Sequence, residues 1–406
     1  MSGQQTLLFV SPRFLFPVDS GGKIRTTQVL RGMKGGQFRI RLMSPATPDL
    51  VARHREDLAQ VCDEFEFWPA PPDGWRGTLG RAWHLLDALP MPVRVDRSDA
   101  AVAAVARALE ARPDVVVFDF LHGAVLAPAT IDVPSVIFTH NVEAQIFARH
   151  LEVARSAVMR AIWRNQLRKM QIYESRTLKR FNVVVAVSAE DARLFERDYG
   201  VRDAHVIPTG VDLEFFSHAP PLRDTDIVFC GSMDWLANQG AMRYFMDDVW
   251  ASIVARMPDA TMTVVGRAPP AALVAEVERR GLSWRFTGFV DDVRPIVRGA
   301  AVSVVPLQVG GGTRLKVFES MAMGPVVVST TIGVEGLPVE SGLNCVVADD
   351  ATAIAGAVVD LLEDRERRLA MSQEARRFVE EKCGYVVAAR SFESACRAAL
   401  TRSQDP

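Results

Sequence analysis

The sequence predicts an α/β protein built from two domains, each with a parallel sheet. Short apolar strands alternate with amphipathic helical segments along most of the chain, which is the pattern of parallel sheets with crossover helices. A length of 406 residues is long for one hydrophobic core and suits two domains of ordinary size. A polar stretch with two consecutive prolines, residues 217–225, is interpreted as the linker between them.

The composition is that of a globular chain without a dominant charge. Hydrophobic residues make up 49% and charged residues 24%, and the formal net charge is −2, so no overall basic character points to nucleic acid. The five cysteines are scattered, with no C-x-x-C pair, which favours reduced, buried thiols. No stretch approaches the ~20 apolar residues that span a bilayer. The apolar run 7–10 is too short for a signal peptide. We therefore expect a cytoplasmic protein.

In the first half, strands are predicted over residues 6–10, 39–44, 64–67, 115–118, 135–139 and 182–187, a helix over 100–110, and a Pro- and Gly-rich surface loop over 69–80. The loop after the first strand carries Gly21 and Gly22 directly before an amphipathic pattern. Two glycines that open a helix offer N–H groups to an anion or a sugar hydroxyl. A plain helix start is the alternative. The G-x-G-x-x-G fingerprint is absent from this turn, which argues against NAD or FAD.

Several polar residues follow strand ends in this half. The strand 135–139 ends at His140, and Glu143 comes soon after it. Ligands of open α/β sheets collect beyond the carboxyl ends of strands, so His140 is a candidate site residue although a lone histidine is more often structural. Asp119 and His122 follow another strand end and are weaker candidates.

A basic region covers residues 149–180. It holds nine Arg or Lys against two acidic residues, and Arg160, Arg164 and Arg168 repeat every four residues, so they form one stripe on a helix. A solvated helix face is the default interpretation. The alternative is a surface for anionic lipid headgroups or a lipid-diphosphate acceptor, to which each cation contributes about 1 kcal/mol.

The second half repeats the strand-and-helix pattern. Strands are predicted over residues 226–230, 261–265, 285–287, 301–305, 326–329 and 344–347, with a helix over 293–298 and two or three helices within 351–400. Asp291 and Asp292 are interpreted as a cap of the helix over 293–298. Asp224 and Asp226 have D-x-D spacing but belong to the linker region. The sequence therefore predicts no metal site.

The densest chemistry lies in residues 305–331, VPLQVGGGTRLKVFESMAMGPVVVSTT, which reads as strand, glycine loop, helix and strand. Glycine suits a place where the backbone comes close to a ligand, and a helix N-terminus is a ready site for phosphate. Arg314 and Lys316 add two cations to the first turn, and Glu319 suits the paired hydroxyls of a ribose. Together these groups indicate a nucleotide. The alternative is an ordinary surface loop with solvated charges.

The run GGTRLKVFESMAMGPVV resembles the nucleotide-sugar signature of glycosyltransferase family 4, the retaining group 1 glycosyl transferases of GT-B fold, with one residue fewer between Gly324 and Pro325. The segment IPTGVD, residues 207–212, resembles the family's second recurrent mark. The resemblance implies two Rossmann-like domains whose parallel sheets face a central cleft. It places an acceptor-side domain over 1–215, the linker over 216–225, a nucleotide-sugar-binding domain over 226–384 and a returning C-terminal helix over 385–406.

The resemblance also implies roles for individual residues. His140, Arg314 and Lys316 are expected near the transferred sugar and the leaving diphosphate, as the catalytic set. The expected donor-binding set is Gly21, Gly22, Ser232, Asn238, Val290, Gly310, Gly311, Gly312, Thr313, Leu315 and Glu319. Acceptor or membrane contacts are expected from Glu143, Arg160, Arg164 and Arg168.

Two departures from the family pattern are visible. Many members carry a second glutamate at the position of Gly311, and many carry an arginine at the position of Ser232 with a lysine several residues later. Without those cations, Arg314 and Lys316 must carry more of the phosphate charge.

The resemblance thus implies a retaining, metal-independent glycosyltransferase of cell-surface polysaccharide synthesis. It would move a sugar from a nucleotide-diphosphate sugar to a glycan or lipid-linked acceptor, with no cofactor and no nucleic-acid partner. The expected location is the cytoplasm, with an anionic membrane surface at its inner face as a further partner. The alternatives are a nucleotide-sugar epimerase of the same fold and a non-catalytic nucleotide-sugar binder.

Overall fold

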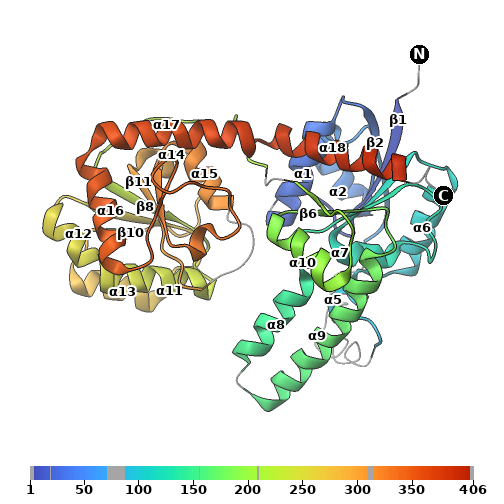
Figure 1. Cartoon of the computed structure of the whole chain (residues 1–406), viewed down its shortest axis with the longest axis horizontal. Coiled ribbons are helices and arrows are strands. Elements are labelled where there is room, and N and C mark those ends of the chain that lie inside the picture. The colour runs from blue at the N-terminus through green and yellow to red at the C-terminus, as the bar shows by residue number, and fades with distance from the viewer. Residues whose placement is uncertain are drawn as a thin grey trace. The chain divides into compact units, whose positions relative to one another are not determined.

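The computed structural model describes residues 4–18, 20–70, 87–154, 156–207, 210–309 and 315–402. The chain forms two compact units (Figure 1): the first combines Met1–Gly210 with Tyr385–Pro406, and the second is Val211–Gly384. Residues 211–225, expected as the end of the first domain and the linker, belong to the second unit. The reason is backbone pairing, since the N–H of Val211 donates to Cys383 O at 2.8 Å and that of Leu222 to Gly299 O at 3.0 Å.

The first unit is built on a sheet that has seven strands in the described residues, all paired in parallel, in the order β3-β2-β1-β4-β5-β6-β7. The strands are β1 Gln5–Val10, β2 Phe38–Ala46, β3 Glu64–Pro69, β4 Val115–Asp119, β5 Ser135–Phe138, β6 Val183–Ala186 and β7 His205–Val206.

Helices cover both faces of this sheet. They are α1 Gly21–Met33, α2 Pro48–Arg53, α3 Arg55–Val61, α5 Met91–Asp96, α6 Asp99–Glu110, α7 Phe120–Gly123, α8 Glu143–Val153, α9 Ala157–Leu178, α10 Ala189–Tyr199 and α18 Tyr385–Arg402, with a 3-10 turn at Ala124–Leu126. Along β1, Leu7 and Phe9 join the core under α1 and α18, whereas Leu8 and Val10 join the core on the opposite face. Because both faces are buried, the strands read as continuous apolar runs.

The second unit repeats the plan with a sheet that has six strands in the described residues, again all parallel, in the order β10-β9-β8-β11-β12-β13. The strands are β8 Asp226–Cys230, β9 Thr261–Val265, β10 Trp284–Phe286, β11 Val302–Val305, β12 Val326–Ser329 and β13 Val346–Val347. The helices are α11 Leu236–Tyr244, α12 Trp250–Arg256, α13 Ala271–Arg280, α14 Arg294–Gly299, α15 Leu315–Met323, α16 Ala351–Glu363 and α17 Arg365–Lys382, with a π turn at Phe245–Val249 and a 3-10 turn at Ile332–Val334.

Both sheets have the strand order of a Rossmann-like fold. In each, the first strand lies in the middle and the chain reverses direction across the sheet, between β1 and β4 in the first unit and between β8 and β11 in the second. Ligands of open α/β sheets bind beyond the carboxyl ends of the strands at such a switch point. The loop after β1, the end of β4, the loop after β8 and the end of β11 all lie at these two places.

Candidate functional site

Five predicted site residues of the glycine-rich run lie outside the described residues: Gly310, Gly311, Gly312, Thr313 and Arg314. The strand and the helix predicted on either side of them are present, since β11 ends at Val305 and α15 begins at Leu315, which is half-buried.

Lys316, Asn238 and Ser232 are brought together by α15, α11 and the loop after β8. Lys316 Nζ donates a hydrogen bond to Asn238 Oδ1 at 3.1 Å and lies 4.4 Å from the centre of the Phe229 ring. Asn238 is only 3% exposed and its amide donates to the backbone oxygen of Ser232 at 2.7 Å. The ammonium group is therefore held in one place, at the carboxyl end of β8.

Glu319 follows Lys316 by three residues on α15, so the two side chains share one face of the helix. Burial raises the pKa of the Glu319 carboxyl to about 7, and the charge of Lys316 acts in the opposite direction. Cys230, at the end of β8, has its thiol pKa raised to about 12 by burial and, to a lesser degree, by the charge of Glu319. Glu319 thus places a carboxylate in a desolvated environment, and its charge acts on the thiol at the end of β8.

The segment after β10 contains Val290, which was predicted to bind the donor. Val290 is half-buried there and packs on the small apolar cluster that contains Val228 and Val265. The isolated bridge between Gly266 and Gly288 ties this segment to the loop after β9. Asp292 Oδ1 accepts the N–H of Arg294 at 2.9 Å, so one of the two aspartates caps the helix start as expected.

Sequence reasoning missed one cation at this edge. Arg267, directly after Gly266 at the end of β9, donates from Nε to Ser232 Oγ at 2.9 Å and to Asp234 Oδ2 at 3.1 Å. It stands beside the position where the family pattern led us to expect an arginine and the sequence has Ser232. Its contact partners are more than thirty residues away in the sequence, so no local motif reveals it.

Large apolar side chains are exposed around the same strand ends. Trp235 is 43% exposed and Leu236 is 78% exposed after β8, Phe289 is 74% exposed after β10, and Val309 is 72% exposed after β11. Parallel strands end at the same edge, so these side chains gather on one side of the second unit. An amphipathic ring such as a nucleobase or a sugar can pack on such side chains. The sequence signal, an aromatic residue placed just before a helix start, was present but too common to interpret.

In the first unit, Gly21 and Gly22 open α1 as predicted. The structure also gives Gly22 a packing reason, because a Cβ at this position would lie 2.6 Å from the ring of Phe120. Phe120 itself has a positive φ of 60° at the end of β4 and stacks on His140 with a ring separation of 4.1 Å. The glycine therefore lets an aromatic residue approach the helix start.

His140 lies in a buried network at the β1–β4 switch point. Arg25 Nη1 lies 3.1 Å from His140 Nδ1, and His140 Nε2 lies 2.7 Å from Asp119 Oδ1. Since a guanidinium only donates, Nδ1 is the acceptor and Nε2–H donates to Asp119. Burial lowers the pKa of His140, so the ring is neutral. Asp119, fully buried, also accepts from Ser11 Oγ at 3.0 Å and from Thr26 Oγ1 at 3.1 Å.

These contacts use both ring nitrogens of His140 and leave the residue 4% exposed. The geometry favours the structural alternative for this residue, in which the ring fixes the end of β5 to neighbouring elements. Its predicted part in the reaction stays a prediction.

Glu143 lies in a second polar cluster, at the start of α8. Its Oε2 is 3.3 Å from His122 Nε2, and Asp96 Oδ2 lies 3.8 Å from His122 Nδ1. Burial alone would lower the pKa of His122, but its contact with Glu143 and the charges of Glu143 and Asp96 raise it. Glu143 is 8% exposed and its carboxylate faces the His122 ring, so an acceptor hydroxyl would meet this pair rather than the lone carboxylate.

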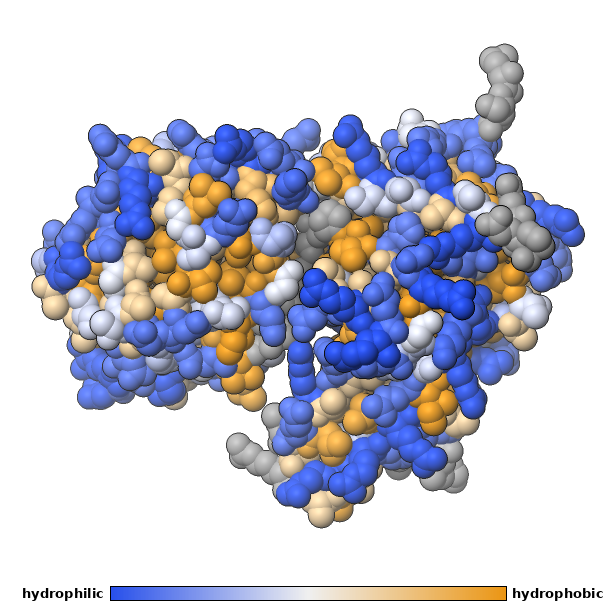
Figure 2. Space-filling model, in the orientation of Figure 1, coloured by the Kyte–Doolittle hydropathy of each residue, from blue (hydrophilic) through white to orange (hydrophobic). Residues whose placement is uncertain are grey.

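The helical hairpin of α8 and α9 extends away from the sheet of the first unit (Figure 1). Arg160, Arg164 and Arg168 are all exposed on α9, so they share one solvent-facing stripe, as predicted. At the first turn of α9, Val158 is 70% exposed and Met159 is 41% exposed. Hydrophilic and apolar surface alternate over this hairpin (Figure 2).

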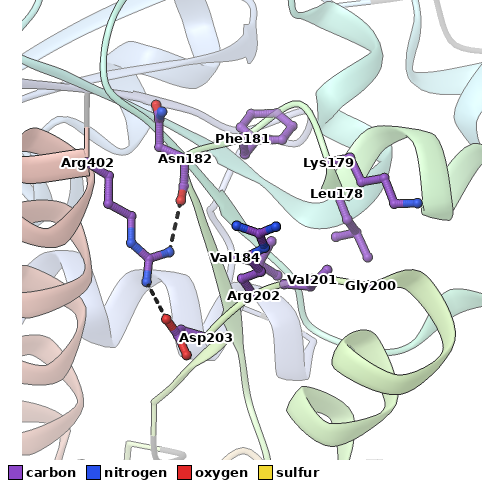
Figure 3. Close-up of a pocket in the computed structure, with 10 residues that line it drawn as sticks. All are labelled: Leu178, Lys179, Phe181, Asn182, Val184, Gly200, Val201, Arg202, Asp203 and Arg402. Carbon is purple, nitrogen blue, oxygen red and sulfur yellow. Dashed lines mark hydrogen bonds and ion pairs between the residues drawn. The ribbon is translucent and has the colours of Figure 1, made fainter. Parts of the chain in front are cut away.

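A pocket of about 440 Å³ lies at the opposite, amino end of β6. Figure 3 shows Arg402 on one side of it, where the guanidinium donates to the backbone oxygen of Asn182 at 3.2 Å and to Asp203 Oδ2 at 3.2 Å. None of the predicted site residues lines this pocket, and its main cation is already paired. The candidate site is therefore at the carboxyl edges of the sheets.

Two Rossmann-like units, each with a sheet of parallel strands and with polar residues at its switch point, define the GT-B class of fold. Two family models match the chain: Glycosyltransferase Family 4 over residues 20–215 and Glycosyl transferases group 1 over residues 224–364. The chain belongs to this glycosyltransferase family, whose two domains it carries in order.

Curated relatives match part of the chain. A phosphatidyl-myo-inositol mannosyltransferase of Mycolicibacterium smegmatis is 30% identical over 193 residues, 45% of this chain and 49% of that protein. An uncharacterized 44.6 kDa protein in the cps region of Klebsiella pneumoniae is 21% identical over 168 residues, 39% of this chain and 43% of that protein. The matched segments thus span less than half the length of these relatives.

Solved structures match nearly the whole chain in fold. HepE of Anabaena in complex with UDP has a TM-score of 0.66 at 14% identity, over 97% of this chain and all of that one. Sucrose-phosphate synthase from Thermosynechococcus elongatus has a TM-score of 0.68 at 16% identity, over 98% of this chain and 99% of that chain. These similarities bear on the fold alone.

Proposed function

We propose that this protein is a retaining glycosyltransferase that moves a sugar from a nucleotide-diphosphate sugar to a glycan or lipid-linked acceptor. The observation that carries the proposal is the pair on α15. Lys316 is fixed by Asn238 at the carboxyl end of β8, and Glu319 lies one turn further along the same helix face. A cation for the diphosphate and a carboxylate for the ribose hydroxyls are thus side by side, directly after a glycine-rich loop.

The proposed chemistry is the departure of a nucleoside diphosphate from the anomeric carbon. As that bond breaks, negative charge grows on the phosphate oxygens, and fixed donors aimed at them can lower the barrier by several kcal/mol. Lys316, with the N-terminal amides of α15, would supply these donors without a metal. In the retaining reaction the acceptor attacks from the face that the diphosphate leaves, and the departing phosphate takes the acceptor proton.

Two properties of relatives support the choice of substrates. The M. smegmatis relative is a mannosyltransferase that acts on phosphatidyl-myo-inositol, which favours a hexose donor and a lipid-linked acceptor here. HepE, the structural neighbour, was solved with UDP and with UDP-glucose. A role in cell-surface polysaccharide synthesis and a place in the cytoplasm are part of the same proposal, as is the absence of a cofactor.

The decisive test is incubation with a panel of nucleotide sugars, with and without a lipid-linked acceptor, followed by product analysis. Transfer to the acceptor with release of nucleoside diphosphate is expected. An altered nucleotide sugar formed without acceptor would indicate an epimerase, and binding without turnover would indicate a non-catalytic binder. Either result would refute the proposed activity.

Lys316→Ala should lower kcat/KM at least tenfold, equivalent to about 1.4 kcal/mol, because the leaving diphosphate loses a fixed cation. Lys382→Ala, an exposed lysine at the end of α17, is the matched control and should leave turnover unchanged. Equal rates for both variants would remove Lys316 from the proposed site.

We further propose that the α8–α9 hairpin docks on anionic membrane. The basic stripe of α9 leads to exposed Val158 and Met159 at its first turn, and cations that flank a small apolar tip suit an anionic lipid surface. No helix of the described chain is long and apolar enough to cross a bilayer, so docking would be peripheral.

Sedimentation with phosphatidylglycerol vesicles tests this surface, with phosphatidylcholine vesicles for comparison. The protein should sediment with the anionic vesicles only, and an Arg160→Ala, Arg164→Ala, Arg168→Ala triple variant should stay in the supernatant. A control variant replaces three exposed arginines of the second unit by alanine: Arg256, Arg279 and Arg377. If the hairpin variant and this control sediment alike, the membrane proposal is wrong.

A further inference from the structure

Arg267 is the strongest feature of the second unit that the proposed function does not yet use. Its guanidinium reaches from the end of β9 across the loop that follows β8. Nε donates to Ser232 Oγ at 2.9 Å, and Nη2 lies 3.1 Å from Asp234 Oδ2. The Ser232 hydroxyl in turn donates to Asp234 Oδ1 at 2.8 Å.

The backbone around Arg267 is fixed at some cost. Met233 N–H donates to Arg267 O at 2.9 Å, which joins the two loops. A Cβ at Gly266 would lie 1.9 Å from Gly231 O, so only glycine permits this approach. Ala268 has a φ of +54°, which costs a non-glycine residue about 1 kcal/mol or more. Such strain gathers at functional sites, because the surrounding structure holds it for a purpose other than stability.

Hydrogen bonds connect Arg267 to the residues of the candidate donor site. Ser232, which Arg267 contacts, accepts through its backbone oxygen from Asn238 Nδ2 at 2.7 Å, and Asn238 Oδ1 accepts from Lys316 Nζ at 3.1 Å. Arg267 and Lys316 therefore belong to one hydrogen-bond network in which Ser232 and Asn238 lie between them. The two cations flank the loop after β8. β8 is the strand at the switch point, where a ligand of this sheet binds.

The contacts of Arg267 are those that a phosphate would make. Its side chain remains 65% exposed, although a hydroxyl and a carboxylate accept its hydrogen bonds. A carboxylate presents two oxygens to a guanidinium fork, and phosphate presents the same pattern with more charge. Asp234, itself 47% exposed, is a partner that a ligand can replace without leaving a buried charge behind.

We propose that Arg267 binds the diphosphate of the nucleotide-sugar donor, exchanging Asp234 for phosphate oxygens. This inference rests on the proposed function, and it names a residue for the diphosphate that neither the sequence signature nor the relatives assign. Arg267 takes the place of the arginine that the family pattern puts at Ser232. The diphosphate is then held between Arg267 on one side of the β8 loop and Lys316 on the other.

Titration calorimetry on the full chain tests the assignment. The probes are two pairs of nucleotides, UDP with UMP and GDP with GMP. The pair that the wild type binds is used for all variants. Arg267→Ala should weaken diphosphate binding at least tenfold while monophosphate binding changes less than twofold, because the proposal needs both cations only for a ligand with two phosphates. Arg267→Lys should recover part of the loss, since it restores the charge without the fork. Arg256→Ala, which removes an exposed, ion-paired arginine of the same unit, should bind like wild type.

The outcomes separate this inference from the proposed function. Thermal unfolding of each variant first checks that the second unit is folded. If Arg267→Ala does not fold, Arg267→Lys is used in its place for the binding test. Diphosphate binding that is unchanged in Arg267→Ala but lost in Lys316→Ala would overturn the role of Arg267 alone. Failure of the wild type to bind any nucleoside diphosphate, with ADP, CDP and dTDP added to the probes, would overturn both.

Discussion

Glu319 and Lys316 carry opposite charges on one helix face, and the environment treats them differently. Lys316 keeps a hydrogen-bond acceptor and an aromatic ring as neighbours, so its charge is compensated in place. No described residue donates a hydrogen bond to the Glu319 carboxylate, and burial raises its pKa to about 7. A carboxylate in this state gains most from a ligand that donates hydrogen bonds to it, which is what the two hydroxyls of a ribose do.

This pKa predicts a pH dependence of nucleotide binding. Glu319 is protonated below about pH 7 in the free protein, and the ribose needs the ionised form as acceptor. Affinity for a nucleoside diphosphate should therefore rise as pH increases, by about tenfold between pH 6 and pH 8 if only the ionised form binds. Calorimetric titrations at several pH values measure the change.

Glu319→Gln provides the control, because glutamine does not titrate. The ratio of wild-type to Glu319→Gln affinity removes the titration of the ligand's own phosphates. A ratio that stays constant from pH 6 to pH 8 would contradict the assignment.

The effect of pH on folding stability has the opposite sign to its effect on binding. A raised carboxyl pKa in the folded state means that the folded protein holds the proton more tightly, so stability declines as pH rises from about 4.5 to about 7.

At the scale of elements, one buried acid organises the hairpin that carries the basic stripe. Glu174, on α9, accepts the N–H of Glu143 at 2.9 Å and of Ala144 at 3.1 Å, both in the first turn of α8. Tyr199 donates its hydroxyl to the same carboxylate at 2.8 Å. Glu174 thus caps the N-terminus of α8, although it lies on a neighbouring helix and not next to the helix start in the sequence.

Glu174→Ala should loosen the start of α8. Two buried N–H groups and the Tyr199 hydroxyl would lose their acceptor, at a cost of about 1–3 kcal/mol for an unsatisfied buried group. Hydrogen exchange measured by mass spectrometry should show faster exchange in residues 143–153. Glu152→Ala, which removes an exposed acid of the same helix, is the control and should exchange like wild type. Unchanged exchange in Glu174→Ala would show that the packing of α8 holds without this cap.

Sequence patterns predicted best the elements that are buried along their whole length. β4 and β12 contain consecutive valines buried on both sheet faces, and the predicted and observed bounds agree closely. α2 has no buried residue and α5 has one, so neither shows the apolar stripe that reveals a helix in a sequence. Arg267 was missed for a related reason, since its position depends on the contact between the loops after two strands. Lys316 and Glu319 could be predicted because they lie on the same helix, next to a glycine-rich run.

For the whole molecule, the buried apolar clusters of the two units share no residues. In the first unit, the core on one face of the sheet is closed by α18, which comes from the end of the sequence: Phe392 is fully buried there and lies 4.9 Å from the Phe138 ring and 6.3 Å from the Phe9 ring. The main core of the second unit is built from one continuous segment, in which Phe245 is fully buried against Trp250 and Trp284. The first unit therefore depends on a distant part of the chain and the second does not.

This difference predicts that the two units respond separately to core mutations. Phe392→Ala and Phe245→Ala each remove a fully buried ring and should cost about 3–5 kcal/mol in the unit that contains it. Hydrogen exchange of the full chain is the measurement, read from peptides of β4 and β5 for the first unit and of β9 and β11 for the second. Phe392→Ala should speed exchange in the first set only, because α18 seals that core alone, and Phe245→Ala should do so in the second set only. Each variant is the other's control, since the substitution and the burial are the same. Parallel acceleration of both sets by either variant would mean that the units unfold as one, and that the boundary at Gly210 is not a boundary of cooperativity.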